Sequence, residues 1–298
     1  MKNMKLKLQI AHNLVRISRR LNDAGKRMIP SMFPGTITVA GKVITDLAPL
    51  GGYHTPGITK AERLSFSGLC EGRKVKLYSV YSAAQADLRV AFQKTDYGNR
   101  YFPEIIAHDQ THIVEEWIDG IPFKKLDKTL QGRGLAEIKR FLSQCGESEE
   151  LIQLAAAHQG AFCYFRDYLV KRLEPWQSLD FVREFILSWQ NLYEKIKDQI
   201  PLCLSHPDLS ANNILLDKCT VRFVVIDNEL LGVGRGWVLD GKNSILNEFG
   251  RMELIHPVQK DVKDFLNLSW RLRWLGTSLD AGDFRQGYSI AINPDFEN

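Results

Sequence analysis

In the first half of the chain, apolar residues occur in short runs of the kind that form β strands. Runs rich in β-branched and aromatic residues, with polar residues between them, occupy residues 44–50, 61–66, 74–80 and 111–117. The spacing of apolar residues over 83–93 is helical instead. The first half is therefore predicted to be rich in strands, with one helix.

The second half has mainly helical spacing. Apolar residues recur at helical intervals over 135–143, 151–173, 179–196 and 258–275. Short apolar runs interrupt this pattern, and they predict strands at 202–205, 214–216 and 221–226, the last two joined by a tight turn at 217–220. The change near residue 120 predicts an α+β protein with a strand-rich unit at 44–120 and a mainly helical unit at 121–298.

Residues 1–43 form a basic leader and a linker. Residues 1–27 carry eight Lys or Arg and one acidic residue, and apolar side chains recur there at helical spacing. The apolar positions are Ile10, Leu14, Ile17 and Leu21. This amphipathic helix could pack on the body, lie on an anionic membrane surface or contact an acidic partner.

Composition narrows the class of protein. The 298 residues are 44% hydrophobic, enough for a sizeable core, and the five cysteines are scattered without the spacing of a disulfide framework or a zinc site. No apolar run is as long as a membrane-spanning helix. We expect a cytoplasmic protein, peripheral at the inner face of a membrane if the leader binds lipid, and no nucleic acid partner, since the body is slightly acidic.

The most informative stretch lies among the strands of the second half. His206, Asp208 and Asn213 form the pattern H-x-D-x-x-x-x-N between two apolar strands, and Asp227 ends the next strand. Phosphoryl transfer needs divalent metal to neutralise phosphate charge, and a carboxylate to accept the proton of the attacking hydroxyl. Asp208 is predicted to be this base, and Asn213 and Asp227 to be oxygen ligands of Mg²⁺.

These residues also have purely structural interpretations. Asp208 and Asn213 could cap the backbone of a turn. His206 is expected to order the loop by hydrogen bonding and not to transfer a proton.

The motif resembles that of the aminoglycoside phosphotransferase and choline kinase group in the protein-kinase-like superfamily. The group's H-G-D-x-x-x-x-N loop and I-D-W-E strand end correspond to H-P-D-x-x-x-x-N starting at His206 and I-D-N-E ending at Glu229. Asp240 falls where the group has a buried aspartate that anchors the catalytic loop. The resemblance covers about residues 44–245. It implies a protein-kinase-like fold with a β-rich N-lobe and a mainly helical C-lobe, catalytic roles for Asp208, His206 and Asp240, and ATP with Mg²⁺ as cofactors.

The same resemblance implies a nucleotide site in the N-lobe. Gly51 and Gly52 look like the loop whose backbone amides approach phosphate oxygens, although a Gly-Gly pair also suits an ordinary turn. Lys76 corresponds to the lysine that contacts the α- and β-phosphates. Strand alternation places Lys74 on the same face as Lys76, so only the family register favours Lys76, and Lys74 is expected to be exposed.

Residues 112–120 resemble the hinge between the lobes. Backbone groups of Glu116 and Ile118 would then contact the adenine edge. A strand that runs into a turn is the alternative interpretation.

One departure from the family concerns the helix predicted at 83–93. It should carry a glutamate that pairs with the lysine, and it has none. Gln85 or Asp87 must replace that glutamate, or the lysine is paired otherwise. The absence keeps a pseudokinase scaffold open as an alternative to an enzyme, and an atypical protein kinase is a second alternative, although the D-F-G and A-P-E signatures are missing.

The leading prediction is transfer of the γ-phosphate of ATP to a hydroxyl of a small molecule, sugar or glycan. A group of aromatic and basic side chains falls in the region where the family builds its acceptor pocket: Trp270, Arg271, Arg273 and Trp274. Stacked rings with arginine suit a sugar or a phosphorylated glycan. Packing of the two tryptophans in the core explains their spacing equally well.

Overall fold

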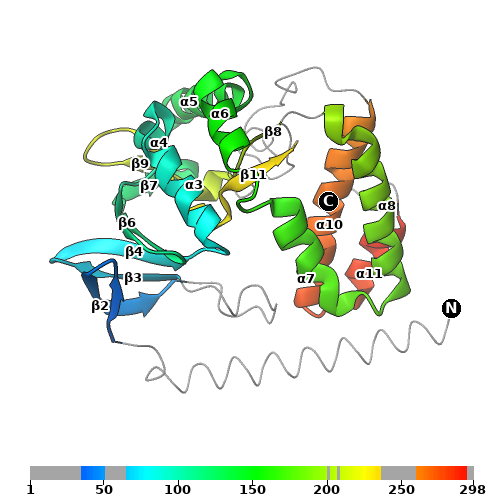
Figure 1. Cartoon of the computed structure of the whole chain (residues 1–298). Coiled ribbons are helices and arrows are strands. Elements are labelled where there is room, and N and C mark those ends of the chain that lie inside the picture. The colour runs from blue at the N-terminus through cyan, green and yellow to red at the C-terminus, as the bar shows by residue number, and fades with distance from the viewer. Residues whose placement is uncertain (1–34, 51–64, 200–201, 207–208, 236–259, 294–298) are drawn as a thin grey trace.

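The computed structural model describes residues 35–50, 65–199, 202–206, 209–235 and 260–293 (Figure 1). The predictions for the leader therefore lie outside the described residues. So do those for Gly51, Gly52, Asp208 and Asp240.

A six-stranded antiparallel sheet forms most of the described N-terminal region. Its order is β1-β2-β3-β4-β6-β5. The strands are β1 (Ile37–Val39), β2 (Lys42–Pro49), β3 (Ser65–Cys70), β4 (Arg73–Ser79), β5 (Ile105–His108) and β6 (His112–Glu116). The sequence predicted β2, β4 and β6 closely and placed β3 several residues too early, but it missed β1 and β5, which have only three and four residues.

Alternation along β4 separates the two faces of the sheet. Val75 and Leu77 are buried in a cluster with Val114 of β6. Lys76 and Tyr78 lie on the opposite face, where Tyr78 is buried in a cluster with Ala86 of helix α3 (Ala83–Gln93). The strand thus contributes apolar side chains to the core of the sheet and polar side chains to the interior between the sheet and α3.

Helix α3 (Ala83–Gln93) begins where the sequence predicts, because the Ser82 hydroxyl accepts a hydrogen bond from the Gln85 amide and caps the helix. The apolar face of α3 packs on helices that follow it in the chain, and not only on the six-stranded sheet. The centre of the Phe92 ring lies 4.8 Å from that of Phe102, and 6.3 Å from that of Phe141 in helix α5 (Lys128–Glu147). Helix α3 is therefore part of the same core as the helices that follow.

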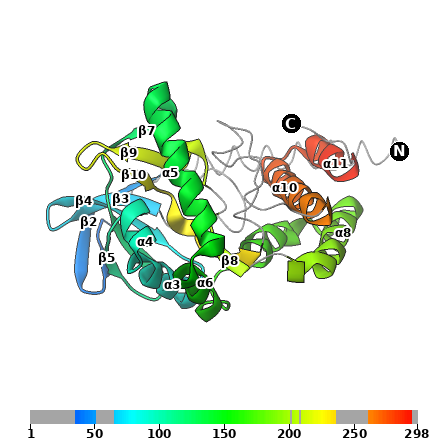
Figure 2. The same cartoon turned by 90° about the horizontal axis from the view of Figure 1, so that it is seen from above.

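The helices after α3 are arranged in two groups. They are α4 (Asp96–Tyr101), α5 (Lys128–Glu147), α6 (Glu149–Ala157), α7 (Lys171–Leu173), α8 (Asp180–Ile196), α10 (Lys260–Asp280) and α11 (Phe284–Ile292). Helices α4, α5 and α6 share a hydrophobic core with α3, and α7, α8, α10 and α11 share a second one. Figures 1 and 2 show the second group on the side away from the six-stranded sheet. No helix of the described residues is long and apolar enough to cross a membrane.

The prediction of one continuous helix over 151–173 is wrong. Helix α6 ends at Ala157, and a π-helical segment (Tyr164–Val170) leads into α7. Between them the Phe162 carbonyl accepts a hydrogen bond from the Val233 amide of strand β11 (Gly232–Arg235) at 2.8 Å. Helical spacing of apolar residues does not reveal such a break, because the connecting segment is also buried.

Two small sheets complete the described fold. Strands β8 (Leu202–Ser205) and β11 (Gly232–Arg235) pair with each other, and β9 (Ile214–Asp217) pairs with both β10 (Phe223–Val225) and β7 (Gly120–Pro122). The hairpin of β9 and β10 was predicted, and Asp217 stabilises its turn by accepting hydrogen bonds from the amides of Cys219 and Thr220. Strands β7 and β11 were not predicted.

Candidate active site

Lys76 lies at the centre of a cluster of charged side chains. Its Nζ is 3.0 Å from Oδ1 of Asp227 and 2.8 Å from Oε1 of Glu229. Lys76 and Glu229 are 13% and 11% exposed, whereas Asp227 is 47% exposed. Strand β4 and the segment after β10, which are far apart in the sequence, therefore bring a lysine and two carboxylates together.

The three groups shift one another's protonation. Burial opposes the charged form of Lys76, but the carboxylates of Glu229 and Asp227 raise its pKa above the usual value. Burial likewise opposes ionisation of Asp227, yet Lys76 lowers the pKa of Asp227 to about 2. Burial raises the pKa of Glu229 to about 7, and Asp227 contributes to this rise while Lys76 counteracts it. The more exposed Asp227 thus carries the full negative charge at neutral pH.

Asp227 has an unusual backbone conformation. Its φ and ψ angles are 68° and 50°, in the left-handed region that aspartate tolerates better than most residues. The turn at Asp227 leads from β10 into a 3₁₀ helix (Asn228–Leu230). As a result, Asp227 and Glu229, two residues apart, both reach Lys76.

Asn213 lies beside this turn. It ends a 3₁₀ helix (Ala211–Asn213), and its carbonyl accepts a hydrogen bond from the Ile226 amide at 2.8 Å. Ile214 pairs with Val225 in the adjoining hairpin, so Asn213 and Asp227 flank the same end of it.

These side chains suit Mg²⁺. In the part of the chain that the structure describes, no group of three or more His, Cys, Asp or Glu is arranged to hold a metal. Mg²⁺ in a nucleotide site does not need such a group, because it keeps water and takes phosphate oxygens with one or two protein ligands. The amide oxygen of Asn213 and the ionised carboxylate of Asp227 are hard oxygen donors of this type.

His206 is buried directly after β8. Its Nε2 lies 3.1 Å from Oδ1 of Asn228, the residue that follows Asp227. The start of the predicted catalytic loop is thus attached to the predicted metal strand. Asp208 itself lies outside the described residues.

Of the predicted hinge residues, Glu116 ends β6 and Ile118 lies between β6 and β7. The Glu116 amide already donates to the Glu104 carbonyl at 2.9 Å, and the Glu116 carboxylate binds Arg222 at 2.9 Å. Ile118 is half-buried. A contact with adenine at this hinge would therefore use the Glu116 carbonyl and the Ile118 amide, not the Glu116 amide.

The structure separates the two lysines of β4. Lys74 is exposed, and its Nζ lies 3.8 Å from the centre of the Trp117 ring. Lys76, two residues further along the same face, contacts the carboxyl groups of Asp227 and Glu229.

Glu229 was not predicted as a site residue. Neither Gln85 nor Asp87 replaces the missing helix glutamate, because Asp87 is exposed and Gln85 donates to the carbonyls of Glu229 (3.1 Å) and Leu231 (2.8 Å). The signal for Glu229 was present in the I-D-N-E motif that it ends. Its partner could be recognised only in the folded chain.

The aromatic and basic group of α10 is mainly structural. Trp270 is buried and packs edge-to-face on Trp274, with 5.8 Å between the ring centres. Arg271 donates to the carbonyls of Ile290 and Asn293 at the end of α11. Arg271 is therefore occupied in joining the two helices.

Comparison with known proteins agrees with this architecture. No protein-family model matches the chain, and no curated protein is significantly similar to it in sequence. Solved structures of thermostable forms of the aminoglycoside phosphotransferase APH(4)-Ia are similar in fold. The apo form has a TM-score of 0.52 at 18% identity and covers 85% of this chain and 93% of that chain.

Two ternary complexes of APH(4)-Ia variants give the same result. The complex with ADP and hygromycin B has a TM-score of 0.51 at 17% identity, over 86% of this chain and 96% of that chain. The complex with AMP-PNP and hygromycin B has a TM-score of 0.51 at 16% identity, over 91% and 96%. The predicted fold class is confirmed: this chain has the two-lobed, protein-kinase-like fold of the aminoglycoside phosphotransferases.

Proposed function

We propose that this protein is a phosphotransferase that uses ATP and Mg²⁺ to phosphorylate a hydroxyl group. The contact of Lys76 with Asp227 and Glu229 carries the proposal. A lysine that neutralises phosphate charge and a carboxylate that can hold Mg²⁺ are the two groups that phosphoryl transfer requires side by side.

Each group has a proposed role. Asn213 and Asp227 would hold Mg²⁺, which, when bound, neutralises the charge on the β- and γ-phosphates. Lys76 would bind the α- and β-phosphates. Asp208 would orient the acceptor hydroxyl and accept its proton, and Asp240 would anchor the catalytic loop.

The remaining nucleotide contacts follow from the order of elements along the chain. Backbone amides of Gly51 and Gly52 would cover the phosphates, since glycine lets a backbone approach closely. Backbone groups of Glu116 and Ile118 would bind the adenine edge.

Glu229 favours an enzyme over a pseudokinase scaffold. The missing helix glutamate was the reason to consider a degenerate site. Glu229 places a nearly buried carboxyl group 2.8 Å from Lys76, beside the ionised Asp227, so the lysine has acidic partners although the helix supplies none. A scaffold that bound nucleotide without turnover would not need this arrangement together with Asn213 and Asp227.

The proposed acceptor is a small molecule, sugar or glycan. APH(4)-Ia, which shares the fold, was crystallised with hygromycin B. An atypical protein kinase is less well supported, because the sequence lacks the D-F-G and A-P-E segments of protein kinases. We further propose that the protein acts in the cytoplasm and that residues 1–27 provide any contact with an anionic membrane.

Divalent-dependent ATP turnover tests the proposal. The wild-type protein should consume ATP only with Mg²⁺, and Asp208→Ala should remove this activity while nucleotide binding remains. Binding without turnover in the wild type would establish the scaffold instead. A mass-spectrometric screen of hydroxylated metabolites and glycans with labelled ATP would then identify the acceptor.

A further inference from the structure

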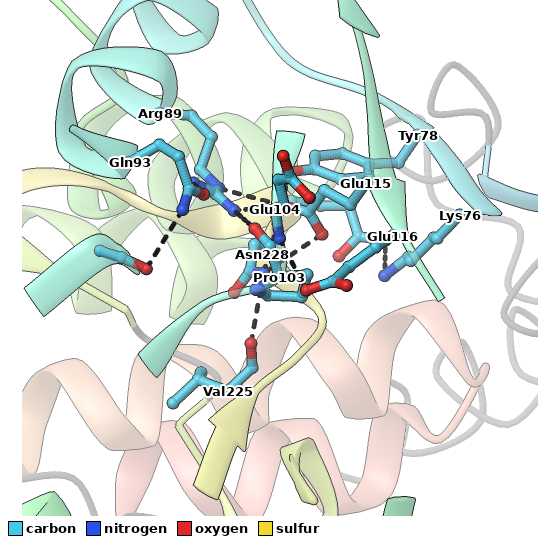
Figure 3. A network of polar contacts seen from close by, with 12 residues as sticks. Lys76, Tyr78, Arg89, Gln93, Pro103, Glu104, Glu115, Glu116, Val225 and Asn228 are labelled. Carbon is cyan, nitrogen blue, oxygen red and sulfur yellow. Dashed lines mark hydrogen bonds and ion pairs between the residues drawn. The ribbon is translucent and has the colours of Figure 1, made fainter. Parts of the chain in front are cut away.

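A buried network of polar side chains joins helix α3 to Glu115 and Asn228 (Figure 3), and Asn228 in turn contacts His206. Arg89 of α3 donates to Oε1 of Glu115 in β6 from Nε at 3.0 Å and from Nη2 at 2.8 Å. Both side chains are 1% exposed. Asn228 donates from Nδ2 to both oxygens of Glu115 at 3.3 Å, and His206 contacts Oδ1 of Asn228.

The contacts around Glu115 require it to be a carboxylate. Arg89 supplies the compensating positive charge. The Tyr78 hydroxyl donates to Oε1 of Glu115 at 2.7 Å. Burial and the Glu115 charge raise the pKa of Tyr78 well above its usual value, so Tyr78 keeps its proton and remains a donor.

An ionised Glu115 determines the orientation of the Asn228 amide. A carboxylate only accepts hydrogen bonds, and so does the Val225 carbonyl, which lies 3.4 Å from Nδ2 of Asn228. Two acceptors on one side therefore hold the amide nitrogen there. The amide oxygen must face His206.

The orientation of Asn228 in turn determines the position of the His206 proton. Oδ1 of Asn228 has no proton to donate, so Nε2 of His206 must be the donor in the 3.1 Å contact. A neutral His206 then carries its proton on Nε2. The tautomer of this histidine is thus set through Asn228 and Glu115 by the charge of Arg89 on a different element.

The network also bears on the proposed site. His206 precedes Asp208 by two residues, and Asn228 directly follows Asp227. The hydrogen bond between the side chains of His206 and Asn228 therefore links two parts of the proposed site. One is the loop that would carry the base, and the other is the turn that would carry a metal ligand. Helix α3 makes a second contact with this turn, because the side-chain amide of Gln85 donates hydrogen bonds to the carbonyls of Glu229 and Leu231.

We propose that Arg89, Glu115 and Asn228 are positioning residues that hold the proton of His206 on Nε2 and thereby set the catalytic loop against the metal turn. This proposal rests on the proposed function for its effect on turnover. Its statement about His206 does not depend on any activity.

Nuclear magnetic resonance tests the tautomer. Long-range ¹H–¹⁵N spectra of the full-length protein, labelled at histidine, distinguish a proton on Nε2 from one on Nδ1. They should be recorded at about pH 8, above the usual pKa of histidine. His206→Gln assigns the signal. We expect the Nε2-protonated form in the wild type and loss of this preference in Asn228→Leu. A wild-type His206 protonated on Nδ1 alone would overturn the proposal.

Turnover tests the positioning role. Asn228→Leu and Glu115→Gln should lower kcat for Mg²⁺-dependent ATP hydrolysis by about 10- to 100-fold, as loss of outer contacts to a metal site does, with a smaller change in KM. Glu115→Gln preserves side-chain size, so it decides the question if Asn228→Leu fails to fold.

Arg172→Met is the matched control, because it breaks another buried ion pair, in which Nε of Arg172 lies 2.6 Å from Oδ2 of Asp280. It should lower Tm but leave kcat and the His206 signal unchanged. If Asn228→Leu and Glu115→Gln behave like this control, the three residues have a merely structural role. Absence of turnover in the wild type would refute the proposed function, while the spectra would still decide the place of the His206 proton.

Discussion

The side-chain amide of Gln85 donates to the main-chain carbonyl of Glu229 at 3.1 Å. Helix α3 therefore does not supply the carboxylate that pairs with Lys76. Instead it holds the backbone of the residue that does. This arrangement explains how the lysine can have a buried counter-ion although the helix lacks a glutamate, and it leads to the first prediction.

Glu229→Gln should weaken catalysis without unfolding the protein. Glutamine keeps the size of the side chain but removes the acidic group that shares Lys76 with Asp227. We expect kcat/KM for ATP to fall by about 10- to 100-fold, equivalent to about 1.4–2.7 kcal/mol. Asp87→Asn on the exposed face of α3 is the control and should behave like the wild type. Equal kinetics for the two variants would mean that Glu229 has no part in the site.

Lys76→Met should weaken ATP binding more than Lys74→Met does. Lys76 lies between two carboxylates beside the proposed metal turn, whereas Lys74 is exposed over Trp117. Titration of each variant with ATP, followed by fluorescence or calorimetry, measures the difference. A larger defect in Lys74→Met would reverse the assignment.

Asp227→Asn should abolish Mg²⁺-dependent turnover while the fold remains. Asparagine also tolerates the left-handed backbone at this position, so the turn should persist. Loss of the charged metal ligand should cost several kcal/mol of transition-state stabilisation. Turnover as a function of Mg²⁺ concentration, together with a thermal melt, checks both parts. Near-normal activity would show that the metal site lies elsewhere.

Gly134→Ala and Gly132→Ala should have opposite effects, although both lie within α5. A Cβ at Gly134 would come within 2.6 Å of the Phe223 ring and 2.7 Å of the Phe123 ring. This overpacking should cost about 1–3 kcal/mol of unfolding free energy. A Cβ at Gly132 meets nothing within 4 Å, so alanine should stabilise the helix by up to about 1 kcal/mol. Thermal or urea unfolding measures both; a shift of the same sign in the two variants would contradict the packing around α5.

Deletion of residues 1–27 should preserve turnover of a soluble acceptor, because no proposed site residue lies there. If the leader binds anionic membrane, the intact protein should sediment with anionic vesicles in a salt-sensitive way and the deleted form should not. Each basic side chain would contribute about 1 kcal/mol near the surface. An insoluble or inactive deletion, with no vesicle binding by the intact chain, would indicate that the leader packs on the body.

The local sequence pattern was enough to predict the positions of the longer strands and of helix α3. Strand β4 alternates apolar and polar residues, β2 and β6 contain β-branched runs, and α3 has both a capping serine and a helical apolar face, so their positions follow from the sequence. Strands β1, β5, β7 and β11 have at most four residues each. Their pairing depends on partners far away in the chain, which periodicity does not report.

The sequence by itself determined the residue types of the candidate site and their order, because hard oxygen donors and a lysine at these spacings suit phosphoryl transfer. Only the tertiary structure decided that Lys76 and not Lys74 faces the carboxylates. It alone decided that Glu229 is the counter-ion, and that Glu115 and Arg89 neutralise each other beside Asn228. The reason is physical: a buried charge needs a partner, and contacts between residues more than a hundred positions apart arise only when the strands and helices pack.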